Sequence, residues 1–260
     1  MSLLEVEALT KVFRRHHGEP GHRAVDQVSF TVEPGETMAL VGESGAGKST
    51  TGRLVLRLIE PDSGSVALGG ADVRALSRRD LRTFRRRAQM VFQDPHSSLD
   101  PRIPIAESVA EPLVVHRIGS RAERRDRVAD LLERVGIGAH LLNRYPAQLS
   151  GGQLQRAAIA RALTTDPELI VCDEPVSALD VSIQAQVINL LTDLQAERGI
   201  AYLFITHDLA LVEAFADTVA VMRNGAIVEQ ATVEQLFRAP RQEYTRELLD
   251  AVPYVPAPQA

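Results

Sequence analysis

The stretch GESGAGKS, residues Gly42–Ser49, fits the phosphate-loop pattern G-x-x-x-x-G-K-[ST] at every fixed position. It lies between an apolar run that ends at Val41 and a segment with helical spacing from about Lys48 to Leu58. A strand, a glycine-rich loop and a helix in this order form the context that the motif requires. The sequence therefore predicts a phosphate-binding loop, and an ordinary glycine-rich turn is the alternative that Lys48 and Ser49 disfavour.

The residue types of this loop suit the binding of a nucleoside triphosphate. Glycines let the backbone turn tightly, so that its amide N–H groups converge on phosphate oxygens, and the following helix adds the positive end of its dipole. Lys48 is expected to reach the terminal phosphates as a point charge, and the Ser49 hydroxyl to bind Mg²⁺. The residues predicted to bind ATP here are Gly42, Ser44, Gly45, Gly47, Lys48, Ser49 and Thr50.

An acidic pair follows a second apolar run. Leu169–Cys172 reads as a strand, and Asp173 and Glu174 come directly after it. A phosphate loop needs a carboxylate on a neighbouring strand for its metal ion, so Asp173 is predicted to hold Mg²⁺ through water. Glu174 is predicted to polarise the water that attacks the γ-phosphate. Two solvated acidic residues at a strand end are the alternative, which the phosphate loop disfavours.

The composition excludes several classes of protein. The chain of 260 residues has 29 Lys and Arg against 34 Asp and Glu, and this net charge of −5 lacks the basic excess of a bulk nucleic-acid binder. No apolar run reaches the roughly 18 residues of a membrane-spanning helix, and the first residues show no secretory signal. The single cysteine, Cys172, allows no internal disulfide and suits a reducing compartment.

The pattern of apolar residues predicts an α/β fold. The first third of the chain reads mostly as strands, residues 97–165 have helical spacing, and strands then alternate with helices, which is typical of a covered parallel sheet. Ser150 is the expected N-cap of one helix. The predicted strands are Leu3–Leu9, Val28–Val32, Met38–Val41, Ser65–Leu68, Gln89–Phe92, Leu169–Cys172, Ala201–Ile205 and Thr218–Met222. The predicted helices are Lys48–Leu58, Ile105–Val115, Arg121–Val135, Ser150–Ala162, Ser182–Arg198 and Leu209–Phe215.

The segment LSGGQ, residues Leu149–Gln153, opens the helix expected after Ser150 and so forms a second anion-binding helix N-terminus. Two such sites in one chain are explained if the second one closes over a nucleotide held by another subunit. The chain resembles the nucleotide-binding subunits of ABC transporters, because this motif is specific to that superfamily and the match covers nearly the whole chain. The resemblance implies that Ser150, Gly152 and Gln153 contact ATP bound to a partner subunit.

This resemblance also implies a fold. It is a P-loop NTPase core of the ABC ATPase type, with a parallel sheet, an N-terminal antiparallel β-subdomain and an inserted α-helical subdomain at about residues 97–165. One ABC ATPase domain is expected over residues 1–252, and residues 253–260 are expected to form a C-terminal tail.

Four further site residues follow from the resemblance. Phe13 resembles the aromatic residue that stacks on adenine, with a core position as the alternative. Gln93, in the run VFQDP, resembles the Q-loop glutamine, which contacts Mg²⁺ and is expected to serve catalysis. Asp180, in SALD, resembles the D-loop aspartate at the dimer seam. His207, in THD, resembles the switch histidine that contacts the γ-phosphate.

Three longer runs resemble the dipeptide, oligopeptide and nickel importers within this superfamily. They are FQDPHSSLDPR from Phe92, YPAQLSGGQ from Tyr145 and DEPVSALDVSIQAQ from Asp173. The resemblance implies an ATP-hydrolysing motor subunit, peripheral on the cytoplasmic face of the inner membrane. Its implied partners are a second ABC ATPase subunit, identical or related, two transmembrane permease subunits and, indirectly, a solute-binding protein, with no nucleic acid. The run after Gln93 is expected to lie in the groove that receives a permease helix.

The alternative is an ABC ATPase outside transport, which acts in iron–sulfur assembly, on DNA or in translation. A DNA-associated member would carry a long coiled coil, whereas about 100 positions without sustained heptads separate Ser49 from Ser150. A translation factor would usually have two ATPase domains, and the importer-like runs argue against iron–sulfur assembly. Many importers carry the motif H-P-Y-T near the C-terminus, where residues 242–245 read QEYT, and the role of this segment stays open.

Overall fold

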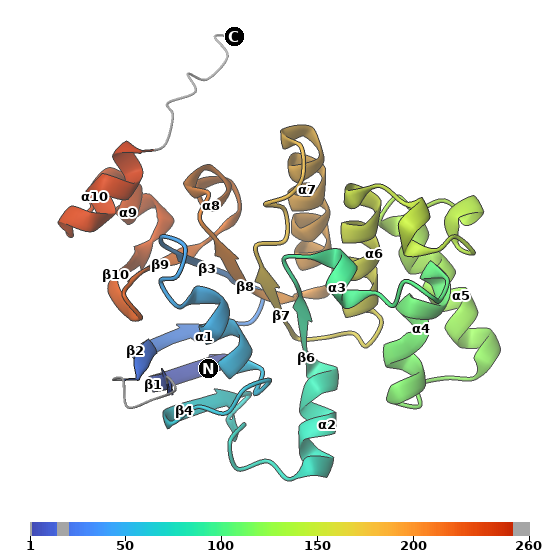
Figure 1. Cartoon of the computed structure of the whole chain (residues 1–260), viewed down its shortest axis with the longest axis horizontal. Coiled ribbons are helices and arrows are strands. Elements are labelled where there is room, and N and C mark those ends of the chain that lie inside the picture. Colours follow the sequence, from blue (N-terminus) through green and yellow to red (C-terminus); the bar gives the residue numbers. More distant parts are fainter. Residues whose placement is uncertain (1, 15–20, 252–260) are drawn as a thin grey trace.

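A six-stranded sheet forms the centre of the molecule (Figure 1). The computed structural model describes residues 2–14 and 21–251, so the predicted tail at 253–260 lies outside the described residues. The strand order is β10-β9-β3-β8-β7-β6, and all neighbours are parallel except β10, which is antiparallel to β9. The strands are β3 (Thr37–Val41), β6 (Ala88–Val91), β7 (Leu169–Asp173), β8 (Ala201–Thr206), β9 (Thr218–Arg223) and β10 (Ala226–Thr232).

A second sheet packs beside the first and is antiparallel throughout, in the order β2-β1-β4-β5. Its strands are β1 (Leu4–Phe13), β2 (His22–Val32), β4 (Ser63–Leu68) and β5 (Ala71–Asp72). Buried and exposed residues alternate towards the end of β2, as expected of a sheet with one solvated face, whereas β3 is buried at every position. Helix α1 (Lys48–Val55) packs between the two sheets, with Leu54 and Val55 in the same apolar core as Leu4 and Ile205.

A group of helices lies together beyond the edge strand β6 (Figure 1). It contains α3 (Pro95–Ser98), α4 (Ile105–Val115), α5 (Arg121–Arg134) and α6 (Gly151–Leu163), with two short 3₁₀ turns at Ala139–Leu141 and Pro146–Gln148. Ser120 caps α5 and Ser150 caps α6, each in a reciprocal capping box with the residue three positions later. Their apolar core is continuous with α7 (Val181–Arg198) and with Tyr202 and Phe204 of β8.

The predicted α/β class and both sheets are confirmed, and the structure corrects several boundaries. The first helix ends at Val55 instead of Leu58, because Arg57 adopts a left-handed backbone with φ +48°. The Arg57 guanidinium donates to the carbonyl oxygens of Val73 (3.0 Å) and Leu76 (2.9 Å), which holds the chain in this turn. Strand β1 runs four residues further than predicted, to Phe13.

Three elements of the C-terminal part were not predicted. They are β10, helix α9 (Val233–Arg238) and helix α10 (Glu243–Asp250), which lie together at the end of the molecule opposite the helical group (Figure 1). Helix α8 (Leu209–Phe215) was predicted and joins the same apolar cluster as β9, α9 and α10. Helix α2 (Arg78–Arg87) buries only Phe84 and otherwise faces solvent.

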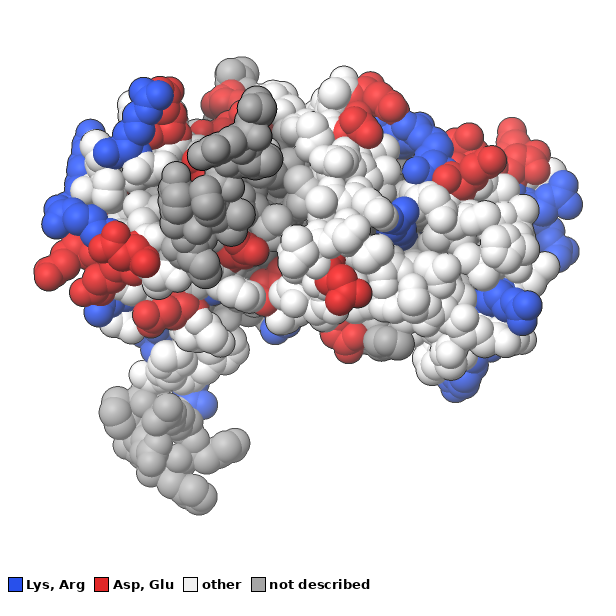
Figure 2. Space-filling model, turned by 90° about the horizontal axis from the view of Figure 1, so that it is seen from above, with Lys and Arg blue, Asp and Glu red and all other residues white. Residues whose placement is uncertain are grey.

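The charge pattern agrees with the near balance of acidic and basic residues. On the face shown in Figure 2, acidic and basic side chains are interspersed, and uncharged residues occupy much of the middle of the face. Within residues 2–14 and 21–251, no helix combines the length and the apolar character needed to cross a bilayer.

Candidate nucleotide-binding site

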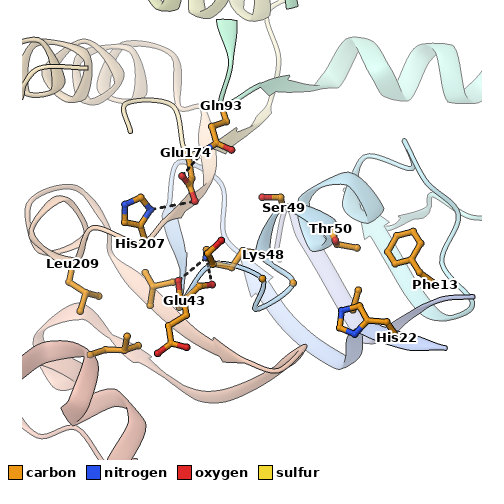
Figure 3. A pocket seen from close by; sticks show the side chains of 17 residues that line it. Phe13, His22, Glu43, Lys48, Ser49, Thr50, Gln93, Glu174, His207 and Leu209 are labelled. Carbon is orange, nitrogen blue, oxygen red and sulfur yellow. Dashed lines mark hydrogen bonds and ion pairs between the residues drawn. The ribbon is translucent and has the colours of Figure 1, made fainter. Parts of the chain in front are cut away.

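A cavity of about 700 Å³ opens beside the phosphate loop (Figure 3). Strands β3, β6, β7 and β8 are parallel, so the loops that follow their carboxyl ends meet at one edge of the sheet. The structure brings most of the predicted site residues to this cavity. Those that line it are Phe13, Gly42, Ser44, Gly45, Gly47, Lys48, Ser49, Thr50, Gln93, Glu174 and His207.

Two glycines of the phosphate loop are required by close backbone contacts. A Cβ atom on Gly42 would lie 2.2 Å from the carbonyl oxygen of Met222, and one on Gly47 would lie 2.2 Å from that of Ala24. Both residues also have positive φ angles, +145° at Gly42 and +104° at Gly47, which disfavour a side chain. The loop can therefore fold this tightly only with glycine at these positions.

Lys48 points back into its own loop. Its Nζ donates to the carbonyl oxygens of Gly42 (2.7 Å) and Glu43 (2.9 Å), and the residue is only 4% exposed. Burial lowers the pKa of Lys48, and the nearby carboxylates of Glu174 and Asp173 oppose this shift. An ammonium held by neutral carbonyl groups at the cavity wall can exchange them for phosphate oxygens, which offer a full opposite charge.

Ser49 lines the cavity and is hydrogen-bonded to Asp173, which lies behind it and is not part of the lining. The Ser49 hydroxyl donates to Asp173 Oδ1 at 2.6 Å, and Asp173 is buried at the end of β7. Burial raises the pKa of Asp173, and the hydrogen bond from Ser49 together with nearby Arg53 counters part of that rise. In the part of the chain that is described, no group of three or more His, Cys, Asp or Glu side chains could hold a metal ion. A cation here would need phosphate oxygens and water as well, which is how Mg²⁺ is usually held.

Glu174 lies between the two other predicted catalytic residues (Figure 3). Gln93 Nε2 donates to Glu174 Oε2 at 2.9 Å, and His207 Nδ1 lies 3.4 Å from Glu174 Oε1. Glu174 has a left-handed backbone, with φ +46°, which is strained for a residue with a side chain and is frequent at functional sites. Three elements distant in sequence thus converge on one carboxylate, which is 15% exposed at the cavity wall.

Phe13 lies at the other end of the cavity (Figure 3). It ends β1, where the antiparallel register pairs it with His22, and it is 43% exposed. This exposure excludes the alternative of a core position. A half-exposed ring at a cavity wall is free to stack on a flat ligand, and Lys11 Nζ already lies 5.7 Å from its centroid.

The remaining predicted contacts lie elsewhere on the chain. Ser150, Gly152, Gln153 and Asp180 line a separate hollow of about 470 Å³ and take no part in the first cavity. The Ser150 hydroxyl accepts from the Gln153 amide at 3.3 Å, and Gln153 Oε1 accepts from the Ser150 amide at 3.0 Å. Within one chain, the two sets of predicted ATP contacts are therefore separate.

Several residues of the cavity were not predicted. His22 and Ala24 come from β2, Leu209 from α8 and Leu248 from α10. No local motif marks these positions. The pairing of His22 with Phe13 depends on the register of β1 and β2, and the approach of Leu248 depends on the packing of α10. Only the tertiary structure could have identified them.

A phosphate loop between a parallel strand and a helix, with an acidic pair at the end of a nearby strand, defines a P-loop nucleoside triphosphatase. A family model described as ABC transporter matches residues 25–177. A probable peptide ABC transporter ATP-binding protein of Sinorhizobium fredii is 51% identical over 262 aligned positions, which cover 99% of this chain and 74% of that protein. The oligopeptide transport ATP-binding protein of Bacillus subtilis is 49% identical over 253 positions, which cover 96% of this chain and 82% of that protein.

A solved structure gives the same assignment. The dimeric structure of an ATP-binding cassette in a post-hydrolysis state, bound to ADP and Pi, matches with a TM-score of 0.81 at 31% identity. The match covers 88% of this chain and 98% of that one. The chain therefore belongs to the ABC transporter family, and it is an ATP-hydrolysing member of that family.

Proposed function

We propose that this chain is the ATP-hydrolysing motor subunit of a bacterial importer for peptides or a related small solute such as nickel. The observation that carries the proposal is the Glu174 carboxylate, which faces the phosphate-loop cavity and is held between Gln93 and His207. The substrate class is supported by relatives about half identical over nearly the whole chain, which are named for peptide and oligopeptide transport.

In this proposal the phosphate loop binds the triphosphate of ATP and Glu174 activates the attacking water. Amides of Ser44, Gly45 and Gly47 turn towards the phosphates, Lys48 pairs with the terminal ones, and Thr50 extends the contact at the start of α1. Glu174 accepts a proton from the water as it attacks, while the Gln93 amide and the His207 ring orient the carboxylate.

The side-chain oxygens of Ser49, Asp173 and Gln93 suit Mg²⁺. Ser49 and Asp173 already lie within hydrogen-bond distance of each other, and Gln93 offers a further oxygen at the cavity edge. When bound, the ion would neutralise charge on the phosphates and on the leaving group. The Ser49 hydroxyl would bind it directly, and Asp173 would bind it through water.

We propose that the separate hollow at Ser150, Gly152 and Gln153 completes the site of a second ABC ATPase subunit. The N-terminus of α6 is an anion-binding end, yet the phosphate loop Gly42–Ser49 does not line the hollow there. Two subunits arranged head to tail would place this end on the partner's ATP, with Asp180 at the seam. The second subunit is either a copy of this chain or a related ATPase.

Replacing Phe13 with Ala is expected to weaken ATP binding. The loss of base stacking should cost about 1–3 kcal/mol, by analogy with aromatic platforms for nucleic-acid bases. Titration calorimetry with ATP measures this, and Phe13→Trp is the matched control because it keeps a stacking ring. An unchanged affinity in the alanine variant would remove Phe13 from the adenine-binding part of the site.

The proposed permease contact includes a groove of about 230 Å³ whose lining reaches Phe92, the residue before Gln93. The run after Gln93, which the resemblance places in the permease groove, does not line this one. The lining of this groove includes Met90, Phe92 and Val115, so it lies between the β6 region and the helical group. We propose that this helical group, at about residues 97–165, is the α-helical subdomain.

Val115 is half exposed in this groove, although it is apolar. The lining also includes the charged residues Arg85, Glu111 and Arg161. This groove between two parts of the ATPase domain is therefore suited to a short permease helix with apolar and polar side chains, which would place the chain at the cytoplasmic face of the membrane.

A pull-down from detergent-solubilised membranes tests this assembly. We expect the tagged chain to co-purify with two permease subunits, and with a sister ATPase if the pair is heteromeric. Val115→Arg is the variant that tests the groove, since it puts a bulky charged side chain at a residue that lines the groove and does not line the phosphate-loop cavity. It should lose the permeases and keep ATP binding, and recovery of the permeases at the parent level would contradict the groove assignment.

The alternative of an ABC ATPase outside transport is not favoured. The relatives at about 50% identity are named as transport ATP-binding proteins. If the pull-down recovered proteins of iron–sulfur assembly, or nucleic acid, in place of permeases, that alternative would replace the importer proposal.

A further inference from the structure

Helix α10 touches the phosphate loop through one tyrosine. The Glu43 amide donates to the Tyr244 hydroxyl at 3.3 Å, across 201 positions of sequence. Tyr244 is 5% exposed, and the Arg223 guanidinium lies over its ring at 4.4 Å from the centroid. One turn later, Leu248 of the same helix lines the cavity. The C-terminal helix is therefore in direct contact with the loop that is expected to bind ATP.

The position of α10 is fixed at its start by an acidic side chain from β10. Glu229 accepts the amides of Arg241 (2.8 Å) and Gln242 (3.0 Å), just before the first turn of the helix. Gln242, the N-cap residue, makes no capping hydrogen bond with its own side chain, and Glu229 instead holds the backbone amides at and just before this position. A buried carboxylate with two amide donors holds the helix, and with it Tyr244, in one place against the loop.

The peptide unit between Gly42 and Glu43 is held from both sides. Its carbonyl oxygen accepts from Lys48 Nζ at 2.7 Å, and its N–H donates to Tyr244. Because the peptide group is planar, these two hydrogen bonds together fix its orientation. When Lys48 turns to a phosphate, the Gly42 carbonyl loses its hydrogen bond to Lys48. The hydrogen bond between the Glu43 amide and the Tyr244 hydroxyl does not depend on Lys48 and remains.

An external hold matters here because a glycine restricts its own backbone less than any other residue does. Gly42 has φ +145°, a conformation that glycine alone adopts without strain. Glycine can also adopt more other backbone conformations than any other residue. The loop must present its amides in one arrangement before ATP arrives, since ordering it during binding reduces affinity.

We propose that Tyr244 is a positioning residue for ATP binding, whose hydroxyl fixes the first peptide of the phosphate loop and makes helix α10 part of the nucleotide site. This inference rests on the proposed role of the cavity as the ATP site. It also gives the segment Gln242–Thr245, whose role the sequence left open, a defined place in the molecule.

Tyr244→Phe tests the proposal in the full chain. This variant keeps the ring and its contact with Arg223 and removes only the hydroxyl. The loss of one neutral hydrogen bond should raise the Kd for ATP by about three- to tenfold. The expected kcat at saturating ATP stays within about twofold of the parent value, because the hydroxyl does not touch the reacting atoms. Hydrogen exchange of the Glu43 amide should become faster, which reports the lost contact directly.

Tyr202→Phe is the matched control. Its hydroxyl is also buried and donates to the Leu191 carbonyl at 3.1 Å, away from the cavity. This variant should lower the melting temperature and leave the Kd for ATP unchanged, which separates a general loss of stability from a loss of positioning. Thermal melting without nucleotide shows whether each variant is folded at the temperature of the titration.

The outcomes distinguish this inference from the proposed function. If the parent chain binds no ATP, the nucleotide site itself is wrong. If the parent binds ATP and Tyr244→Phe binds it with the same Kd, the positioning role is overturned while the nucleotide site stands. The same conclusion follows if Tyr202→Phe weakens ATP binding as much as Tyr244→Phe, because the effect is then one of stability.

Discussion

Replacing Glu174 with Gln should abolish ATP turnover and leave ATP binding intact. Glutamine has nearly the same shape and can still contact Gln93 and His207, but its amide cannot take a proton from water. General-base catalysis contributes about 10²- to 10⁴-fold to a rate, so phosphate release should fall by at least about two orders of magnitude. Phosphate release in a single turnover measures the chemical step, and calorimetry measures binding in the same preparation.

The matched control for this variant is Glu168→Gln. Glu168 precedes β7, whereas Glu174 follows it, and its carboxylate pairs with Arg87 on the surface. The two substitutions thus remove the same charge at opposite ends of one strand. Glu168→Gln should keep the parent turnover rate. Turnover of Glu174→Gln near the parent rate would show that another group activates the water.

The second large effect is expected from Lys48→Ala, which should weaken ATP binding itself. The Lys48 ammonium is buried at the cavity wall and is poised to exchange two carbonyl oxygens for phosphate oxygens. A hydrogen bond to a charged group contributes about 1.5–3 kcal/mol, so the affinity for ATP should fall by about 10- to 100-fold. Titration calorimetry with ATP and with AMP measures this, because AMP lacks the terminal phosphates and its binding should change little.

Lys48→Arg tests whether the size and shape of the side chain matter in addition to its positive charge. Arginine keeps the positive charge but brings a planar and bulkier group into a space that Gly42 and Glu43 enclose. We expect ATP binding weaker than in the parent. An unchanged ATP affinity in Lys48→Ala would contradict the assigned role of the loop, whatever the arginine variant shows.

The parts of the site that the sequence predicts are those coded by contiguous residues. A local pattern is sufficient to predict a site element that combines the end of a strand or helix with a few fixed side chains. Three elements are of this kind: the loop Gly42–Ser49, the acidic pair at Asp173 and the cap at Ser150. Gln93 and His207 were predicted from the resemblance, and their convergence on Glu174 agrees with a parallel sheet, in which the carboxyl ends of the strands share one edge.

What the sequence does not reveal depends on contacts between distant segments. Tyr244 meets Glu43 only because Glu229 of β10 fixes the start of α10, and neither element was predicted. The short length of α10 is not the reason, because α8 has only seven residues and was predicted; a local pattern does not show which distant segment a helix packs against. The early end of α1 likewise depends on carbonyl groups of Val73 and Leu76, which become partners of Arg57 only in the folded chain.

The central claim is that ATP bound in the Lys48 cavity is closed off by the Ser150 end of a second subunit and hydrolysed through Glu174. The most direct test is light scattering of the Glu174→Gln chain with Mg²⁺ and ATP, combined with a count of bound nucleotide. It is done with the chain alone and with any sister ATPase that co-purifies. We predict a dimer that forms with ATP and not with ADP and that holds two ATP molecules. If the Glu174→Gln chain binds ATP and stays monomeric, both alone and with the sister ATPase, the account is contradicted.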